Sequence, residues 1–153
     1  MRKIVKVLLA VMMMWVFAGC GAKEELKEVP EGFCKGYEEA VFDKFNSNAS
    51  ENGLGGTKIW LEGSYKEILT MDTEGMTLYY AVFKTHDNHE WLLMLDAYPA
   101  APKEPYEKLY GHKIRVVGTY EGYSSVYAMP VIYLHSLYDR SNGAIIGSAA
   151  FAE

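Results

Sequence analysis

The sequence predicts a mainly β protein, a small closed Greek-key barrel of five strands preceded by an amphipathic helix. Three observations support this fold class. Five short strand-like runs lie between residues 57 and 138, and in the first of them, TKIWLEGSYKEI, successive residues alternate with a period of two. Gly63 and Gly118 fall inside the first and fourth runs, where a barrel strand has to bend or bulge. A connection with three prolines, which cannot be a strand, separates the third run from the fourth.

Turn residues bound the five predicted strands. The stretch MDTEG ends the first strand, and the loop EGYSSVYAM links the last two. The proline-containing connection AYPAAPKEPYEKLYG is expected to carry a short helix around residues 104–109. The strands themselves are predicted at TKIWLEGSYKEI, MTLYYAVFK, EWLLMLD, HKIRVVGTY and PVIYLHSL.

The chain begins with a predicted signal peptide, residues 1–19. A basic start is followed by an apolar run from Val7 to Phe17 that is eleven residues long. A membrane-spanning helix needs about 20 apolar residues, so this run is too short to span a bilayer. It ends in the small residues Ala18 and Gly19, followed by Cys20.

The ending FAGC resembles the lipobox of bacterial lipoproteins. The resemblance implies cleavage before Cys20 and a diacylglyceryl group on its sulfur. A second acyl chain such as palmitate would make the anchor stable, because one chain alone holds a protein only marginally. The protein is therefore expected outside the cytoplasm, lipid-anchored to the cell membrane. The alternative is ordinary secretion without lipid on Cys20. Cys34 then has no partner, and we interpret it as a small apolar residue of a helix.

The mature chain is predicted to have three parts besides the barrel. Residues 20–32 form a charged tether, and residues 33–56 form the amphipathic helix and a glycine-rich joint. Residues 139–153 form a tail without clear periodicity. The helix prediction depends on apolar residues at a spacing of four, namely Phe33, Tyr37, Val41 and Phe45.

Three stretches of the chain together resemble a known family. They are NGLGGTKIWLEG, EKLYGHKIRVVGTYEGYS and MPVIYL. They resemble bacterial OB-fold lipoproteins related to the tRNA-anticodon-binding-like group, over roughly residues 36–137. The resemblance depends on glycine and hydrophobic placement. It implies an OB-fold barrel and an extracytoplasmic location, and it carries over no catalytic residues.

The stretch THDNHEW, residues 85–91, offers two interpretations. His86 and His89 could form part of a metal site in a hydrolase, with nearby acids as further ligands. The favoured interpretation is a hairpin turn, because Asp87 and Asn88 tolerate turn conformations between two alternating strands. We therefore expect a non-catalytic protein with no metal and no cofactor. No phosphate-binding loop, GxSxG or HExxH motif occurs in the chain.

Charge argues against nucleic acid as a partner. The chain has 15 Lys and Arg against 20 Asp and Glu, a net charge of −5. Removal of the signal peptide takes away three positive charges, which leaves −8. Nucleic-acid binding draws most of its affinity from neutralising phosphates. An acidic protein without a Lys/Arg cluster lacks that contribution.

An aromatic outer face is the predicted ligand site. If alternate residues fill the barrel, an outward set remains on the first three strands, the face OB folds often use for ligands. The set predicted to point inward is Ile59, Leu61, Leu78, Tyr80, Val82, Trp91, Leu93 and Leu95. The outward set is Trp60, Tyr79, Phe83, Leu92 and Met94, joined by Tyr123 and Tyr127 from the last loop.

Three interpretations of this outer face remain open. It could bind an uncharged glycan or an envelope protein. It could instead be covered by the helix, in a purely structural or assembly lipoprotein. It could also be the contact surface of a dimer.

Overall fold

The computed structural model describes residues 25–46, 53–73, 75–96 and 104–147. The elements in these ranges are mostly strands. In chain order they are β1 (Glu38–Glu39), α2 (Phe42–Phe45), β2 (Lys58–Thr73), β3 (Met76–Thr85), β4 (Glu90–Asp96), α4 (Glu104–Glu107), β5 (Ile114–Ser124), β6 (Met129–Asp139) and β7 (Ile145–Gly147).

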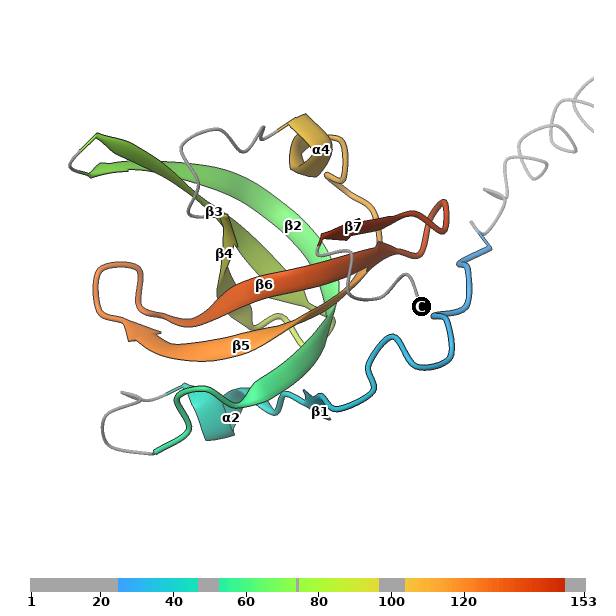
Figure 1. The fold of residues 1–153 in the computed structure, drawn as a ribbon, viewed down its shortest axis with the longest axis horizontal. Coiled ribbons are helices and arrows are strands. Elements are labelled where there is room, and N and C mark those ends of the chain that lie inside the picture. Colours follow the sequence, from blue (N-terminus) through green and yellow to red (C-terminus); the bar gives the residue numbers. More distant parts are fainter. Residues whose placement is uncertain (1–24, 47–52, 74, 97–103, 148–153) are drawn as a thin grey trace, which may run out of the picture.

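Five of the strands close into a barrel in the order β2-β3-β4-β6-β5, and β5 pairs back with β2 (Figure 1). All neighbours are antiparallel except β4 and β6, which are parallel. This order and connectivity are those of an OB fold, so the predicted fold class is confirmed. Both predicted barrel glycines lie where two backbones approach closely. A Cβ at Gly63 would press on the Lys84 carbonyl, and one at Gly118 on the Tyr133 carbonyl.

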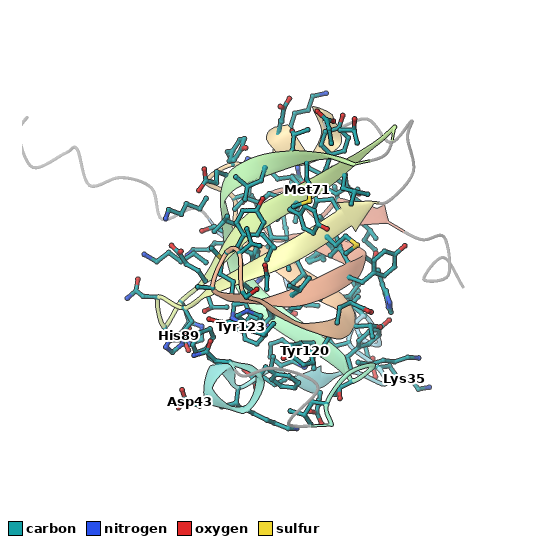
Figure 2. The ribbon with its side chains drawn as sticks, turned by 90° about the vertical axis from the view of Figure 1, so that its left-hand side faces the viewer. Lys35, Asp43, Met71, His89, Tyr120 and Tyr123 are labelled. Atoms are coloured by element: carbon teal, nitrogen blue, oxygen red, sulfur yellow. The ribbon has the colours of Figure 1, made fainter. Side chains whose placement is uncertain are left out.

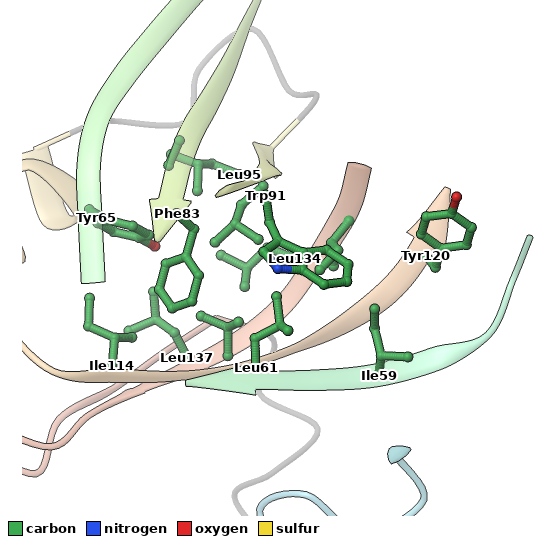
Figure 3. Close-up of a cluster of buried hydrophobic side chains, with 14 of the residues drawn as sticks. Ile59, Leu61, Tyr65, Phe83, Trp91, Leu95, Ile114, Tyr120, Leu134 and Leu137 are labelled. Carbon is green, nitrogen blue, oxygen red and sulfur yellow. The ribbon is translucent and has the colours of Figure 1, made fainter. Parts of the chain in front are cut away.

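The barrel interior is filled mainly by apolar side chains from the five strands. Phe83 and Trp91 point into the same cluster as Leu61 and Leu134 (Figure 3). The same core includes Phe45 of α2 and Leu109, which follows α4. Phe45 of α2 lies against Tyr120, whose hydroxyl donates to the Phe45 carbonyl at 2.9 Å. The buried residues of this core are Phe45, Ile59, Leu61, Tyr65, Ala81, Phe83, Trp91, Leu93, Leu95, Leu109, Ile114, Val116, Tyr120, Ile132, Leu134 and Leu137.

A bulge in β2 changes which residues of that strand face the core. Tyr65 pairs with Phe83 and Glu67 with Val82, so Lys66 is the extra residue. Before the bulge, odd-numbered residues such as Tyr65 point inward. After it, Ile68 packs on the core and Leu69 packs on the outer surface.

The predicted helix over residues 33–52 is helical only at Phe42–Phe45 within the described residues, and residues 47–52 lie outside them. Residues 31–36 instead form turns, in which Gly36 has φ +83°, a conformation that a continuous α-helix does not contain. We call residues 27–41 the strap. The strap runs along the outside of the barrel, and its β1 pairs with β2 in parallel (Figure 1).

The segment after β6 is partly ordered. β7 pairs with β6 through three residues, from Ile145 opposite Tyr138 to Gly147 opposite Ser136. The predicted unstructured tail therefore begins with a short strand, and residues 148–153 lie outside the described part of the chain. No helix in the described ranges is long and apolar enough to cross a membrane.

Candidate functional site

The stretch 85–91 contains a hairpin turn between β3 and β4. The Asn88 amide donates to the Thr85 carbonyl and the Thr85 amide to the His89 carbonyl, both at 3.0 Å. Asn88 has φ +68°, which asparagine tolerates better than most residues. The Thr85 hydroxyl bonds to the Asp87 carboxylate and holds its pKa below the usual range, with a smaller contribution from His89. The predicted turn is confirmed.

The two histidines of the turn have different surroundings. His89 stacks on Phe42 of α2 with ring centroids 4.0 Å apart, and its Nδ1 lies 2.9 Å from Asp87. His86 is exposed. A cavity of about 40 Å³ lies beside it, between the turn and the strap; it has room for water but not for a drug-sized ligand. Within the described ranges, no three His, Cys, Asp or Glu side chains are placed to share a metal ion.

A second polar cluster, not predicted from the sequence, lies at the β6–β7 turn. His112 Nδ1 is 2.7 Å from Asp139, whose carboxylate is fully buried. The other carboxylate oxygen accepts the Ser141 amide at 2.8 Å, and the Asp139 carbonyl accepts the Gly143 amide. Asp139 thus caps the turn, and this structural role explains its burial. The bond to Ser141 is a local turn contact, but His112 is 27 residues from Asp139, so no local motif could have indicated their pairing.

The residues that the sequence predicts to point outward do not form one surface. Some lie on two different outer surfaces, and others lie in the core. Phe83 is fully buried in the core, and Tyr79 packs against it, so the prediction that they point outward is wrong. Leu78, Tyr80 and Val82 face outward instead. The cause is that β3 is apolar on both faces, so its period of two could not select the inner face.

Trp60 faces outward but is covered by the strap. Together with Tyr37, Val29 and Cys34 it packs on a cluster formed by Phe33, Val117 and Tyr138. The Arg115 guanidinium lies 4.0 Å from the centre of the Trp60 ring. Such a stacked cation adds to the apolar packing. Trp60 is therefore part of an internal contact and is not an open platform.

An ion-pair network supports the same contact. Glu62 accepts from Arg115 Nε at 2.9 Å and from Arg140 Nη1 at 2.7 Å. Arg140 also donates through Nε to the Lys27 carbonyl at 3.0 Å. One carboxylate on β2 thus connects β5, the end of β6 and the start of the strap. The three side chains are about one-fifth to one-quarter exposed, so solvent screens them only in part.

The other outer surface lies on β2, β3, β4 and β6. We call it the outer patch. At its centre are Tyr80, Val82 and Leu92, which are 9%, 2% and 1% exposed. Burial, and secondly the nearby Tyr127, raises the pKa of Tyr80. Partly buried apolar residues surround this centre, namely Leu69, Met71, Leu78, Met94, Tyr127, Met129 and Val131.

Two hairpins flank the outer patch. The β2–β3 and β5–β6 hairpins extend to the same side of the barrel (Figure 1). Figure 2 views the molecule from that side, with Met71 toward the β2–β3 hairpin and Tyr123 on the β5–β6 hairpin. The turn at 125–128 includes Ala128 at φ +54°, and the Ser124 hydroxyl accepts the Tyr127 amide at 3.3 Å.

Of the predicted ligand residues, Met94 and Tyr127 belong to the outer patch, as does Leu92. Tyr123 is partly buried and is not one of the residues that pack into that cluster. Cys20 lies outside the described residues. No family model, curated protein or solved structure matches this chain.

Proposed function

We propose that this chain is a lipoprotein anchored outside the cytoplasm through Cys20, and that its non-catalytic OB-fold barrel binds an envelope protein through the outer patch. The signal-peptide features and the FAGC ending support the anchor. The outer patch supports the binding role, because it is a contiguous apolar surface on the face that OB folds often use for ligands.

The composition of the patch favours a protein over a glycan. Three of its members, Met71, Met94 and Met129, are methionines, whose flexible and polarisable side chains adapt to a protein surface. Methionine and aromatic residues are enriched in protein interfaces. A glycan would instead stack on aromatic rings, for which Tyr80 and Tyr127 are the two tyrosines of the patch.

The experiment is site-specific photocrosslinking in intact cells that express the protein. A photoreactive residue replaces Met94 in one variant and, in a matched control, Val41, which is 61% exposed and lies on the strap. We expect one defined protein to be crosslinked from position 94 and not from position 41. Purified partner should then bind the soluble chain that starts at Gly21. Met94→Lys should weaken this binding by at least about tenfold, because it places an unpaired charge in an apolar contact.

Two outcomes would overturn the protein-binding role. One is equal crosslinking from both positions. The other is a Met94→Lys variant that binds the partner as tightly as the original chain. Glycan binding by the purified chain, lost in Tyr127→Ala, would favour the glycan over the protein. A loss of stability without any ligand to lose would favour a purely structural lipoprotein.

The anchor is tested separately by labelling cells with an alkyne analogue of palmitate. The label should enter the chain and be absent from Cys20→Ala. Equal labelling of the two would exclude Cys20 as the lipid site.

A further inference from the structure

The start of the strap is fixed to the barrel. The Lys27 amide donates to the Arg140 carbonyl at 2.7 Å, and Arg140 Nε donates to the Lys27 carbonyl at 3.0 Å. A few residues later, Phe33 is buried against Tyr138. The predicted tether of residues 20–32 therefore contains a docked part. Between Cys20 and Lys27 only six residues remain. The seven steps from Cys20 to Lys27 span at most about 25 Å when the chain is fully extended.

The end of the barrel that receives this short connection carries exposed apolar side chains. Tyr110 is 43% exposed and Ile145 is 48% exposed. Both lie close to the docking point, because Ile145 pairs with Tyr138 and the Lys113 carbonyl accepts the Arg140 amide at 2.8 Å. We call this surface, formed by Lys27, Tyr110 and Ile145, the tethered end.

The tethered end has the chemistry of a headgroup contact. Tyrosine is enriched at the boundary between membrane and water, and an isoleucine adds apolar area. The exposed Lys27 can place its stem along the surface and its charge in the headgroup layer. Charged residues next to these segments in the sequence are of both signs, namely Glu25, Glu28, Glu107, Lys108, Lys113 and Arg140. Because the charges are mixed, the contact does not require anionic lipid.

Both hairpins point away from the tethered end (Figure 1). β2 continues from Glu62, which is paired with Arg140, for eleven more residues to Thr73. At a rise of about 3.3 Å per residue, this is roughly 36 Å of strand. β5 continues from Arg115 for nine residues to Ser124, or about 30 Å. Measured along the strands, each hairpin tip is therefore farther from the anchored connection than the connection is long.

We propose that the tethered end docks on the headgroups of the membrane that holds the lipid on Cys20, and that the two hairpins and the outer patch face away from that membrane. This inference rests on the lipid anchor of the proposed function. The short connection keeps the tethered end at a high effective concentration near the bilayer, so a weak surface contact suffices. A partner of the outer patch then approaches from the far side.

One feature competes with this orientation. Val126, at the tip of the β5–β6 hairpin, is 81% exposed. If Val126 inserted into the membrane instead, the barrel would lie with its hairpins against the bilayer. The experiment therefore has to compare the two ends of the molecule directly.

The test uses the full lipidated chain in phosphatidylcholine vesicles, with and without nitroxide on the lipid headgroups. Cys34→Ser leaves no other free thiol, and serine can still accept from Arg115. A fluorophore is then attached to Lys113→Cys in one sample and to Ser125→Cys in the other, both at exposed positions. We expect nitroxide to quench the label at position 113 several times more than the label at position 125. Equal quenching, or stronger quenching at 125, overturns the orientation.

A double variant, Tyr110→Ser with Ile145→Ser, tests the contact itself. It should remain in the vesicle fraction through its lipid but lose most of the quenching at position 113, with an unchanged circular dichroism spectrum. Unchanged quenching would mean that these side chains do not hold the tethered end to the surface. If the full chain does not float with vesicles, both the lipid anchor of the proposed function and the orientation proposed here are wrong. If it floats but the labels at positions 113 and 125 are quenched equally, only the orientation is wrong.

Discussion

The cluster around Trp60 under the strap and the outer patch are two apolar surfaces on the outside of one barrel. Different parts of the chain cover them. Around Trp60 the chain supplies its own cover, because Phe33 and Tyr37 of the strap pack there. On the outer patch the central side chains are covered mainly by their apolar neighbours on adjacent strands. A surface that the chain covers itself contributes to stability. The outer patch, which two hairpins flank, is the surface that we propose for a partner.

The largest expected effect comes from removing the strap's anchor. Phe33→Ala should lower the free energy of unfolding by about 3 kcal/mol, because it empties a buried aromatic site. Urea denaturation of the soluble chain measures the change. The matched control is Val41→Ala, at a strap position that is 61% exposed, which should cost less than about 0.5 kcal/mol. Equal effects of the two variants would contradict the assignment of the strap as a structural cover.

The second effect concerns the ion-pair network under the strap. Glu62→Gln keeps the shape but removes the charge shared by Arg115 and Arg140. We expect a loss of about 1–2 kcal/mol, less than for a fully buried pair, because the three side chains are partly exposed. Binding at the outer patch should not change, since Glu62 lies under the strap. A variant as stable as the original chain would show that the network contributes no net stability.

The smallest effect is a dependence of strap docking on pH. His135 Nδ1 lies 2.9 Å from the Tyr37 hydroxyl and Nε2 lies 2.9 Å from the Thr119 hydroxyl. Burial, and secondly the charge of Lys58, lowers the pKa of His135 below its ordinary value of 6.5, against a smaller opposite effect of Glu121. The folded protein therefore favours the neutral imidazole.

The contribution of neutral His135 to the free energy of unfolding should be fully present above about pH 7. It should decrease as the pH falls through 6.5 toward the lower pKa that His135 has in the folded state. Urea denaturation at several pH values between about 7.5 and 5.5 measures this slope. His135→Gln should reduce the slope and leave the other ionisable groups unchanged. Asp87, whose pKa is also lowered, titrates at more acidic pH and does not contribute in this range. An identical slope in the His135→Gln variant would contradict the prediction.

Local patterns predicted most of the barrel. The five strands, the turn at 85–89 and the two barrel glycines follow from strand-like runs and from residues suited to tight backbone positions. Two strands are longer than predicted, because β2 extends to Thr73 and β5 to Ser124, into stretches expected to be turn and loop. Of the four residues whose spacing predicted the helix, Phe33 and Phe45 are buried and Tyr37 is partly buried, although they lie on a strap and a short helix instead of one long helix. Val41, the fourth, is 61% exposed. The spacing of four therefore indicated a segment that packs on the barrel, but neither its interruption at Gly36 nor the exposure of Val41.

The inner and outer faces of β3 could not be assigned in this way. Every residue from Leu78 to Phe83 is apolar, so neither register is disfavoured by the sequence of that strand. Pairing of Phe83 with Tyr65, next to the bulge at Lys66, selects the register. That pairing exists only in the closed barrel. The outer patch, and with it most of the candidate site, therefore depends on tertiary structure.

Residues that are neighbours along the chain are enough to predict the barrel class, its strands and turns, and a lipid anchor. They do not predict which apolar surface the strap covers, which one remains between the hairpins, or how close to Cys20 the chain is fixed to the barrel. Each of these depends on contacts between distant segments. Arg140 bonds to Lys27 across 113 residues, and no local pattern encodes that contact.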